Sequence, residues 1–325
     1  MENKAINNDT IWKDTKGNEI LAQGGDMLKV GDVYYWFGAE FVGNSKFCNI
    51  KCYSSKDLIN WKFENNVLTR QPSGNLAKDH WIGRPSVIYN CTTKNYVMIF
   101  EWNSPGVPRN RVAFAQCSTV TGVYNWVGSA IAEGRSFGDM AVYKDTDENA
   151  YLLTVMDEGL DLEDGKEVNY SLAIFKLQAD YCSLKGKVFE GFEMSKREAT
   201  YIVKKDEVYY WFSSDMRGWE SSETKYSTAV NLAGPWSTLK IVANCPNTHN
   251  SYNSQHDFII TVQGSDTTCY IYCGDRYSNF HGIGTGRYMW TPLTFIDGKP
   301  KIQWFPSWNV DATTGIWTES NRELS

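Results

Sequence analysis

The feature that most constrains the fold is an aromatic β-hairpin that the chain repeats five times. Each copy centres on a tyrosine, and these tyrosines follow one another at intervals of 61, 55, 59 and 60 residues: DVYYWFG around Tyr35, KNYVMIF around Tyr96, ENAYLLTV around Tyr151, EVYYWFS around Tyr210 and TCYIYCG around Tyr270. A second pair of strands is expected after each hairpin. A unit of about four strands that recurs every ~40–60 residues is typical of a propeller blade. The repeat therefore predicts an all-β, five-bladed β-propeller.

The repeats account for nearly all of the 325 residues. Helical periodicity is weak, and no linker or low-complexity stretch separates the repeats. We expect a single catalytic domain over residues 1–325, in which the two ends of the chain are available to pair and close the ring. The expected blades are residues 20–66, 82–130, 137–192, 196–245 and 253–306.

Charge and hydropathy exclude two classes of partner. The net charge of −6 and the pI near 5.4 argue against nucleic acid and against an anionic membrane surface, since both favour clustered Lys and Arg. No apolar run approaches the ~18 residues of a membrane span. Residues 1–13 are polar and do not have the apolar segment of a signal peptide. The compartment stays open, because a leader could have been removed.

The cysteines give no evidence of a metal or redox centre. The chain has eight, without metal-site spacing and without a CxxC pair. We expect free thiols, as in an intracellular or anaerobic setting, with secretion and bridges between strands as the alternative.

Candidate catalytic residues come from the start of each blade. The first strand of a blade lines the propeller axis, so residues at its beginning are expected to meet in one funnel. Asp139 and Glu198 each lie 12 residues before the tyrosine of their hairpin, so they are expected to face the same space. Two carboxyl groups in one funnel favour acid and base chemistry on a glycoside. The alternative is that both are ordinary carboxylates at strand ends.

Several segments resemble a known family. SFGDMAVYKDTDENAYL, which contains Asp139, and REATYIVKKDEVYYWFSS, which contains Glu198, resemble two segments of glycoside hydrolase family 43. Further segments are similar to its exo-β-1,3-galactanase subfamily: GGDMLKVGDVYYWFGAE, YSSKDLINW, RPSVIYNCTTKNYVM, RGWESSETKYSTA and YNSQHDF. The resemblance implies an inverting hydrolase with Glu198 as the general acid. It also implies that Asp139 raises the pKa of the acid and positions it.

The general base is the point at which the resemblance gives no direct match. Most of the family has an Asp base in blade 1, where this chain has Gly24. The galactanase subfamily shares this gap, and the resemblance implies Gln255 as the base. A neutral amide is a poor proton acceptor, so Asp26 is a second candidate. It lies two residues after Gly24 and would point to the same face of a regular strand.

Other candidate residues concern sugar binding. Glu40 and Arg84 match binding positions of the subfamily, and Gln23 stands where the subfamily often has His. Three aromatic residues could stack on a sugar ring or pack in the core: Trp219, Tyr277 and Trp290.

One departure from the subfamily concerns its substrate. A Glu usually precedes the Arg-Pro pair, and this chain has Gly83 instead. Glu101, where the subfamily often has His, could supply the missing charge from another direction.

The resemblance implies an exo-acting enzyme that releases galactose from β-1,3-galactan main or side chains of the arabinogalactan type. The alternatives are an α-L-arabinofuranosidase or β-xylosidase of the same family, a non-catalytic carbohydrate-binding propeller, or an interaction scaffold. An oligosaccharide or polysaccharide is the expected partner. A structural calcium ion occurs in parts of the family, but the associated His has no clear match, so no metal or cofactor is expected.

Overall fold

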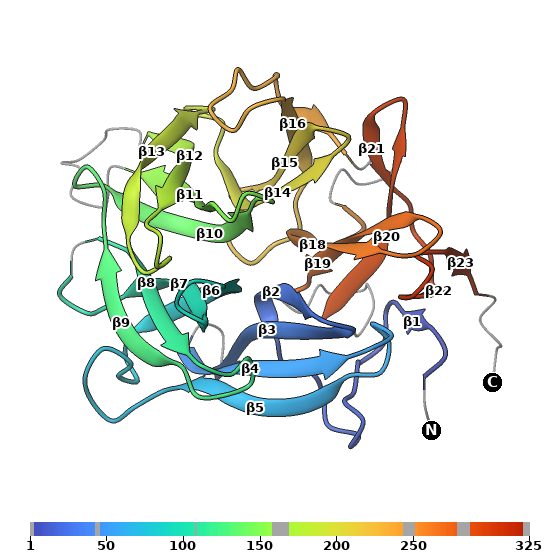
Figure 1. The fold of residues 1–325 in the computed structure, drawn as a ribbon, viewed down its shortest axis with the longest axis horizontal. Helices are drawn as coiled ribbons and strands as arrows, with labels where there is room; N and C mark the ends of the chain where they lie inside the picture. Colours follow the sequence, from blue (N-terminus) through green and yellow to red (C-terminus); the bar gives the residue numbers. More distant parts are fainter. Residues whose placement is uncertain are drawn as a thin grey trace.

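The computed structural model describes residues 3–42, 46–107, 109–157, 169–242, 251–277 and 287–320. These residues form a β-propeller of antiparallel sheets (Figure 1). Blade 1 contains β2 (Gln23–Val30), β3 (Val33–Val42), β4 (Lys46–Ser55) and β5 (Lys62–Thr69). Blade 2 contains β6 (Trp81–Asn90), β7 (Asn95–Asn103), β8 (Arg111–Cys117) and β9 (Asn125–Ala130). Blade 3 contains β10 (Ser136–Lys144), β11 (Ala150–Asp157), β12 (Tyr170–Leu177) and β13 (Leu184–Gly191).

Blade 4 contains β14 (Arg197–Lys205), β15 (Val208–Asp215), β16 (Lys225–Ala229) and β17 (Lys240–Ile241). Blade 5 contains β18 (Gln255–Gln263), β19 (Thr268–Asp275), β20 (Tyr288–Ile296) and β21 (Lys299–Ile302). The remaining sheet has three strands: β1 (Ile6–Asn7), β22 (Ser307–Val310) and β23 (Trp317–Glu319).

The described residues therefore form six sheets, five of four strands and one of three, and the prediction of five blades is wrong because it leaves out the sixth sheet. The two ends of the chain pair with each other through β1 and β22 and make a sheet of their own. They add no strand to any of the five four-stranded sheets. The sixth sheet lies near both termini, beside the seam between blades 5 and 1 (Figure 1). Its strands are too short to carry the aromatic hairpin pattern on which the count of five depended.

The first strands of the four-stranded blades surround the axis. β2 contacts β6, β6 contacts β10, β10 contacts β14, β14 contacts β18, and β18 returns to contact β2. The hairpins that begin each blade have tight turns. For example, Asp206 and Glu207 join β14 to β15 with φ angles of 48° and 61°, and two successive positive values are the signature of a type I′ turn. Five separate strands thus present their first residues at one end of the axis.

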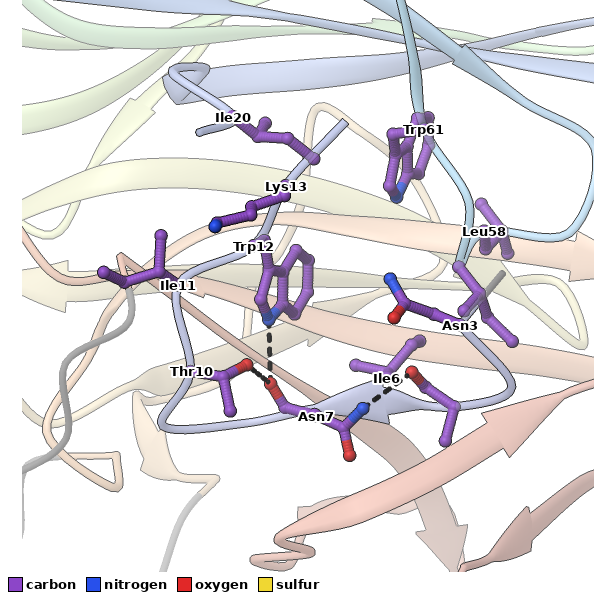
Figure 2. Close-up of a pocket in the computed structure, with 12 residues that line it drawn as sticks. Asn3, Ile6, Asn7, Thr10, Ile11, Trp12, Lys13, Ile20, Leu58 and Trp61 are labelled. Carbon is purple, nitrogen blue, oxygen red and sulfur yellow. Dashed lines mark hydrogen bonds between the residues drawn. The ribbon is translucent and has the colours of Figure 1, made fainter. Parts of the chain in front are cut away.

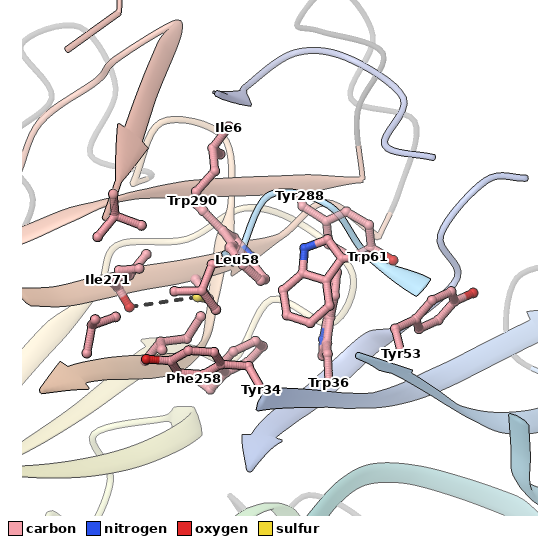
Figure 3. Packing of buried hydrophobic residues seen from close by; sticks show 14 of the residues in the cluster. Ile6, Tyr34, Trp36, Tyr53, Leu58, Trp61, Phe258, Ile271, Tyr288 and Trp290 are labelled. Carbon is pink, nitrogen blue, oxygen red and sulfur yellow. Dashed lines mark hydrogen bonds between the residues drawn. The ribbon is translucent and has the colours of Figure 1, made fainter. Parts of the chain in front are cut away.

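An aromatic cluster closes the ring at the seam between blades 5 and 1 (Figure 3). Trp36 and Trp61 meet at 5.4 Å between ring centroids, and Trp61 and Trp290 meet edge to face at 6.0 Å. Their indole N–H groups are buried without a hydrogen-bond partner in the described structure, and edge-to-face contacts place ring edges against ring faces instead. Trp290 has no exposed surface. Its ring packs in the core and is not accessible to a sugar.

The N-terminal segment is fixed across this seam (Figure 2). It covers a small cavity of about 150 Å³ beside Trp61. The Asn7 carbonyl oxygen accepts hydrogen bonds from the Trp12 indole at 2.8 Å and the Thr10 hydroxyl at 2.7 Å. The Asn8 side-chain amide donates to the Trp290 carbonyl oxygen at 2.9 Å. These contacts attach the start of the chain to its last four-stranded blade.

The seven cysteines within the described ranges are free thiols, and Cys245 lies outside those ranges. No helix in the described part of the chain is long and apolar enough to cross a membrane.

Candidate active site

A β-bulge near the start of every axial strand shapes the site. The register with the second strand of the blade shifts at the same place in all five: between Gln23 and Asp26, Gly83 and Ser86, Phe137 and Met140, Glu198 and Tyr201, and His256 and Phe258. Gly24, Arg84 and Ala199 lie in these bulges with φ angles of 60°, 49° and 49°. A bulge redirects side chains out of the regular alternation of a strand. The bulges therefore turn polar groups of separate blades toward one space on the axis.

That space is a cavity of about 380 Å³, within the size range of small-molecule sites. It contains most of the residues that the sequence singled out: Arg84, Glu101, Asp139, Glu198, Trp219, Gln255 and Tyr277. Other lining residues had no signal that set them apart from packing or loop residues: Phe41, Trp81, Asn103 and Asn110.

Arg84 is the centre of the polar network. Its guanidinium is buried and donates to the Asp139 carboxylate at 2.7 Å, to the Asp257 carboxylate at 2.5 Å and to the Gln255 amide oxygen at 3.2 Å. Asp139 also accepts a hydrogen bond from the Ala199 backbone N–H at 3.1 Å. The network therefore joins blades 2, 3, 4 and 5, and it fixes Asp139 next to the strand that carries Glu198.

Glu198 has the environment of a carboxylic acid that keeps its proton. Burial, followed by the negative charge of Asp139, raises the pKa of Glu198 to about 8. The Gln255 amide nitrogen donates to its carboxyl group at 2.6 Å, and the Arg217 backbone N–H lies 3.4 Å away. A carboxyl group that is protonated at neutral pH can donate a proton to a leaving oxygen.

Gln255 is in direct contact with Glu198 rather than across a sugar from it. Its amide nitrogen is 2.6 Å from Glu198 and its amide oxygen accepts from Arg84. In an inverting glycosidase the acid and the base stand roughly 6.5–9.5 Å apart, so that a water fits between the base and the sugar. Gln255 can hold such a water only after its hydrogen bond to Glu198 breaks.

Asp26 lies outside this cavity. It lines a different hollow, of about 810 Å³, further along the axis, with Tyr201 beside it. Its carboxylate accepts hydrogen bonds from the Met27 N–H at 2.7 Å and the Tyr201 hydroxyl at 3.1 Å. The expectation that Asp26 shares a face with Gly24 is wrong, because the bulge between Gln23 and Asp26 interrupts the alternation on which it depended.

Replacing Asp26 by Asn is expected to leave kcat within about threefold of wild type, since no base is removed from the cavity. Burial raises the pKa of Asp26 to about 7. The folded state therefore keeps a proton that the unfolded state releases, and stability falls as pH rises from about 4 to 7. Asn lacks this penalty, so the variant should be more stable than wild type at pH 8, by on the order of 2–4 kcal/mol, and similar at pH 4.

Urea unfolding at the two pH values, with kcat measured in parallel, tests both expectations. A loss of kcat above about tenfold without a pH-dependent gain in stability would restore Asp26 as a base candidate.

Two other predicted binding residues are not part of the cavity lining. Glu40 forms an ion pair with Lys51 at 3.0 Å and accepts from the Asn49 amide at 2.6 Å. Gln23 is buried, and its amide nitrogen donates to the Arg276 carbonyl oxygen at 2.9 Å.

Two carboxyl groups of blade 5 bind the backbone of the bulge at Gly24 and Gly25. Asp275 accepts from the Gly24 N–H at 2.6 Å, and Asp257 accepts from the Gly25 N–H at 2.9 Å. Burial raises the pKa of both carboxyl groups. The sequence analysis did not single out either carboxyl group, although Asp257 lies in the segment YNSQHDF, which resembles the galactanase subfamily.

Aromatic rings form one wall of the cavity. Phe41 and Trp81 stack at 5.4 Å, and Trp219 meets Tyr277 at 5.0 Å between centroids. Trp219 is 38% exposed, which leaves part of its ring accessible from solvent. Among the residues with described positions, no group of three or more His, Cys, Asp or Glu side chains is placed to hold a metal ion.

Comparison with known proteins shows the family to which the chain belongs. The sequence profile of Glycosyl hydrolases family 43 matches residues 21–305. An exo-β-1,3-galactanase from Clostridium thermocellum is 32% identical, with a TM-score of 0.85 over 98% of this chain and 69% of that one. An exo-β-1,3-galactanase from Phanerochaete chrysosporium, crystallised with galactose, is 31% identical, with a TM-score of 0.85 over 98% of this chain and 71% of that one.

A curated relative, a xylan 1,3-β-xylosidase from Vibrio sp, is 22% identical over 273 residues, or 79% of this chain. The chain spans 48% of that relative's length. The match to the family over most of the chain and the similarity to solved galactanases lead to one conclusion: this chain belongs to glycosyl hydrolases family 43.

Proposed function

We propose that the protein is an inverting exo-glycosidase that releases galactose from β-1,3-linked galactan. The observation that carries this proposal is the pair of Glu198 and Asp139 in one cavity, where burial and the Asp139 charge raise the pKa of Glu198. The family accounts for the glycosidase activity. The choice of galactan is supported by the two similar structures, both of which are of exo-β-1,3-galactanases.

Glu198 is the general acid in this proposal. It donates its proton to the glycosidic oxygen as the bond to the anomeric carbon breaks, so the leaving sugar departs as a neutral alcohol. Asp139 is the positioning residue. It is held by Arg84 and the Ala199 N–H, and its fixed negative charge disfavours ionisation of Glu198.

Gln255 is the residue that places the attacking water. Its amide oxygen accepts from Arg84 and its amide nitrogen donates to Glu198. When a sugar separates Gln255 from Glu198, the same amide can hold a water on the opposite face of the ring. A water that attacks from that face gives a product of inverted anomeric configuration.

A second candidate function keeps the reaction and changes the sugar to xylose or arabinofuranose. Gly83 favours it, because this position has no side chain to contact a galactose hydroxyl. The name of the Vibrio relative, a xylan 1,3-β-xylosidase, also favours it.

The test is turnover of four substrates: β-1,3-galactan and the 4-nitrophenyl glycosides of β-galactopyranose, β-xylopyranose and α-L-arabinofuranose. We expect galactose to be released from the first two. Turnover of a pentoside alone would replace the first proposal by the second. If wild type and Glu198→Gln bind a sugar equally and neither cleaves any, the protein is a carbohydrate-binding propeller.

A further inference from the structure

Glu101 is a buried carboxyl group in the cavity wall. The proposed mechanism does not use it. It lies on β7, is 6% exposed, and lines the same cavity as Asp139 and Glu198. One of its carboxylate oxygens accepts from the Asn110 side-chain amide at 3.0 Å, and the Trp81 side chain also hydrogen-bonds to the carboxyl group. No ion pair of Glu101 occurs among the residues whose positions are described.

A buried carboxylate without an ion pair is costly unless its oxygens accept hydrogen bonds. Two neutral donors are present, whereas a carboxylate has room for about four. The remaining acceptor positions are on a group that lines a cavity next to the candidate acid. This arrangement suits a ligand that brings its own donors, and sugar hydroxyls are such donors.

The strand opposite explains why the carboxyl group comes from β7. Glu101 pairs directly with Gly83 across the β6 and β7 ladder. A Cβ atom at Gly83 would stand 3.0 Å from the Trp81 ring, so the indole occupies the space that a side chain at residue 83 would need. Because residue 83 has no side chain, Glu101 is the member of this pair whose side chain faces the cavity.

We propose that Glu101 determines sugar specificity by accepting hydrogen bonds from two adjacent hydroxyl groups of the sugar at which cleavage occurs. The proposal rests on the proposed function, since that sugar is the one next to Glu198. Glu101 and Glu198 line one cavity, and the Asp139 charge acts on both carboxyl groups. Trp81, whose side chain hydrogen-bonds to Glu101, lines the same cavity.

The test pairs an enzyme change with a substrate change. Binding of galactose, xylose and arabinose is measured by titration calorimetry, followed by each monodeoxy analogue of the sugar that binds most tightly. Burial raises the pKa of Glu101 to about 7, so the titrations are carried out at pH 8, where the carboxyl group is mostly ionised. For wild type, removal of one of the two hydroxyls should then weaken binding by about 10- to 100-fold, as for a hydrogen bond to a charged group. In Glu101→Ala the same removal should cost less than about threefold, because its partner is gone.

Glu101→Gln serves as the second variant, since it keeps the shape of the carboxylic acid if the alanine variant fails to fold. In this variant, removal of at least one of the two hydroxyls should weaken binding less than it does in wild type. Glu64→Gln, on the outer strand β5, is the matched control, and it should bind every analogue like wild type.

The proposal would be overturned if removal of each hydroxyl weakened binding equally in wild type and in the Glu101 variants. It would also be overturned if wild type bound none of the sugars. The proposed function fails separately. Suppose that removal of a hydroxyl weakens binding more in wild type than in the Glu101 variants, but wild type cleaves no glycoside. The inference about Glu101 then holds and the catalytic proposal does not.

Discussion

Replacing Glu198 by Gln is expected to lower kcat on β-1,3-galactobiose by about 10²- to 10⁴-fold, the usual contribution of a general acid. Gln keeps the size of the side chain and can still contact Gln255, so the cavity should stay intact. It cannot give a proton to the leaving oxygen. KM should change little, because the proton transfer occurs in the transition state and not in the bound substrate.

Two further measurements separate loss of the acid from simple damage. A substrate with a dinitrophenol leaving group needs little protonation, so its kcat should fall far less than that of the disaccharide. Since the pKa of Glu198 is raised to about 8, wild-type activity should fall as pH rises through about 8, when the acid loses its proton. This basic limb should be missing in the variant. Equal losses on both substrates, or a kcat within about tenfold of wild type, would contradict the assignment.

Replacing Arg84 by Met is expected to destabilise the protein by about 3–5 kcal/mol at pH 8, the cost of leaving buried carboxylates without their partner. Arg84 is the cation that pairs with both Asp139 and Asp257. Activity should also be lost, because Asp139 and Gln255 would no longer be held. At pH 4 the loss of stability should be smaller, since burial raises the pKa of Asp257 to about 6 and the carboxyl group is then neutral.

Urea unfolding of wild type and variant at pH 4 and pH 8 gives this comparison. Arg135→Met is the matched control. Arg135 pairs with Glu190 at 2.5 Å and does not line the cavity, so that variant should lose stability without losing kcat. A loss of stability in Arg84→Met that is the same at both pH values would mean that unpaired carboxylates are not its cause.

The sequence predicted the architecture where a strong local pattern was present. The aromatic hairpins located five sheets, because alternating aromatic and β-branched residues next to tight turns are a local signal. The sixth sheet has no such signal. It forms because β1 pairs with β22, some 300 residues later in the chain, and a contact over that distance leaves no short-range pattern.

The candidate site followed from equivalence between blades, and its errors came from departures from regular geometry. Asp139 and Glu198 have the same spacing to the tyrosines of their hairpins, and both line the cavity, although Asp139 lies inside the bulge of β10 and Glu198 lies directly before the bulge of β14. Asp26 was placed by the alternation of a regular strand, and the bulge at Gly24 and Gly25 broke that alternation. The contact between Gln255 and Glu198 depends on side-chain orientation across two blades, which sequence spacing does not specify.

The central claim is that Glu198 and a water held on the opposite face of the sugar act together in this cavity. The most direct test is a proton NMR time course of the hydrolysis of the methyl β-glycoside of β-1,3-galactobiose, followed from the first minutes before mutarotation. The leaving sugar of this substrate has a blocked anomeric centre, so only the cleaved end releases free galactose. We expect α-galactose to appear first from the cleaved end, and we expect Glu198→Gln to release neither anomer over the same period. β-Galactose as the first product, or undiminished release by the variant, would contradict it.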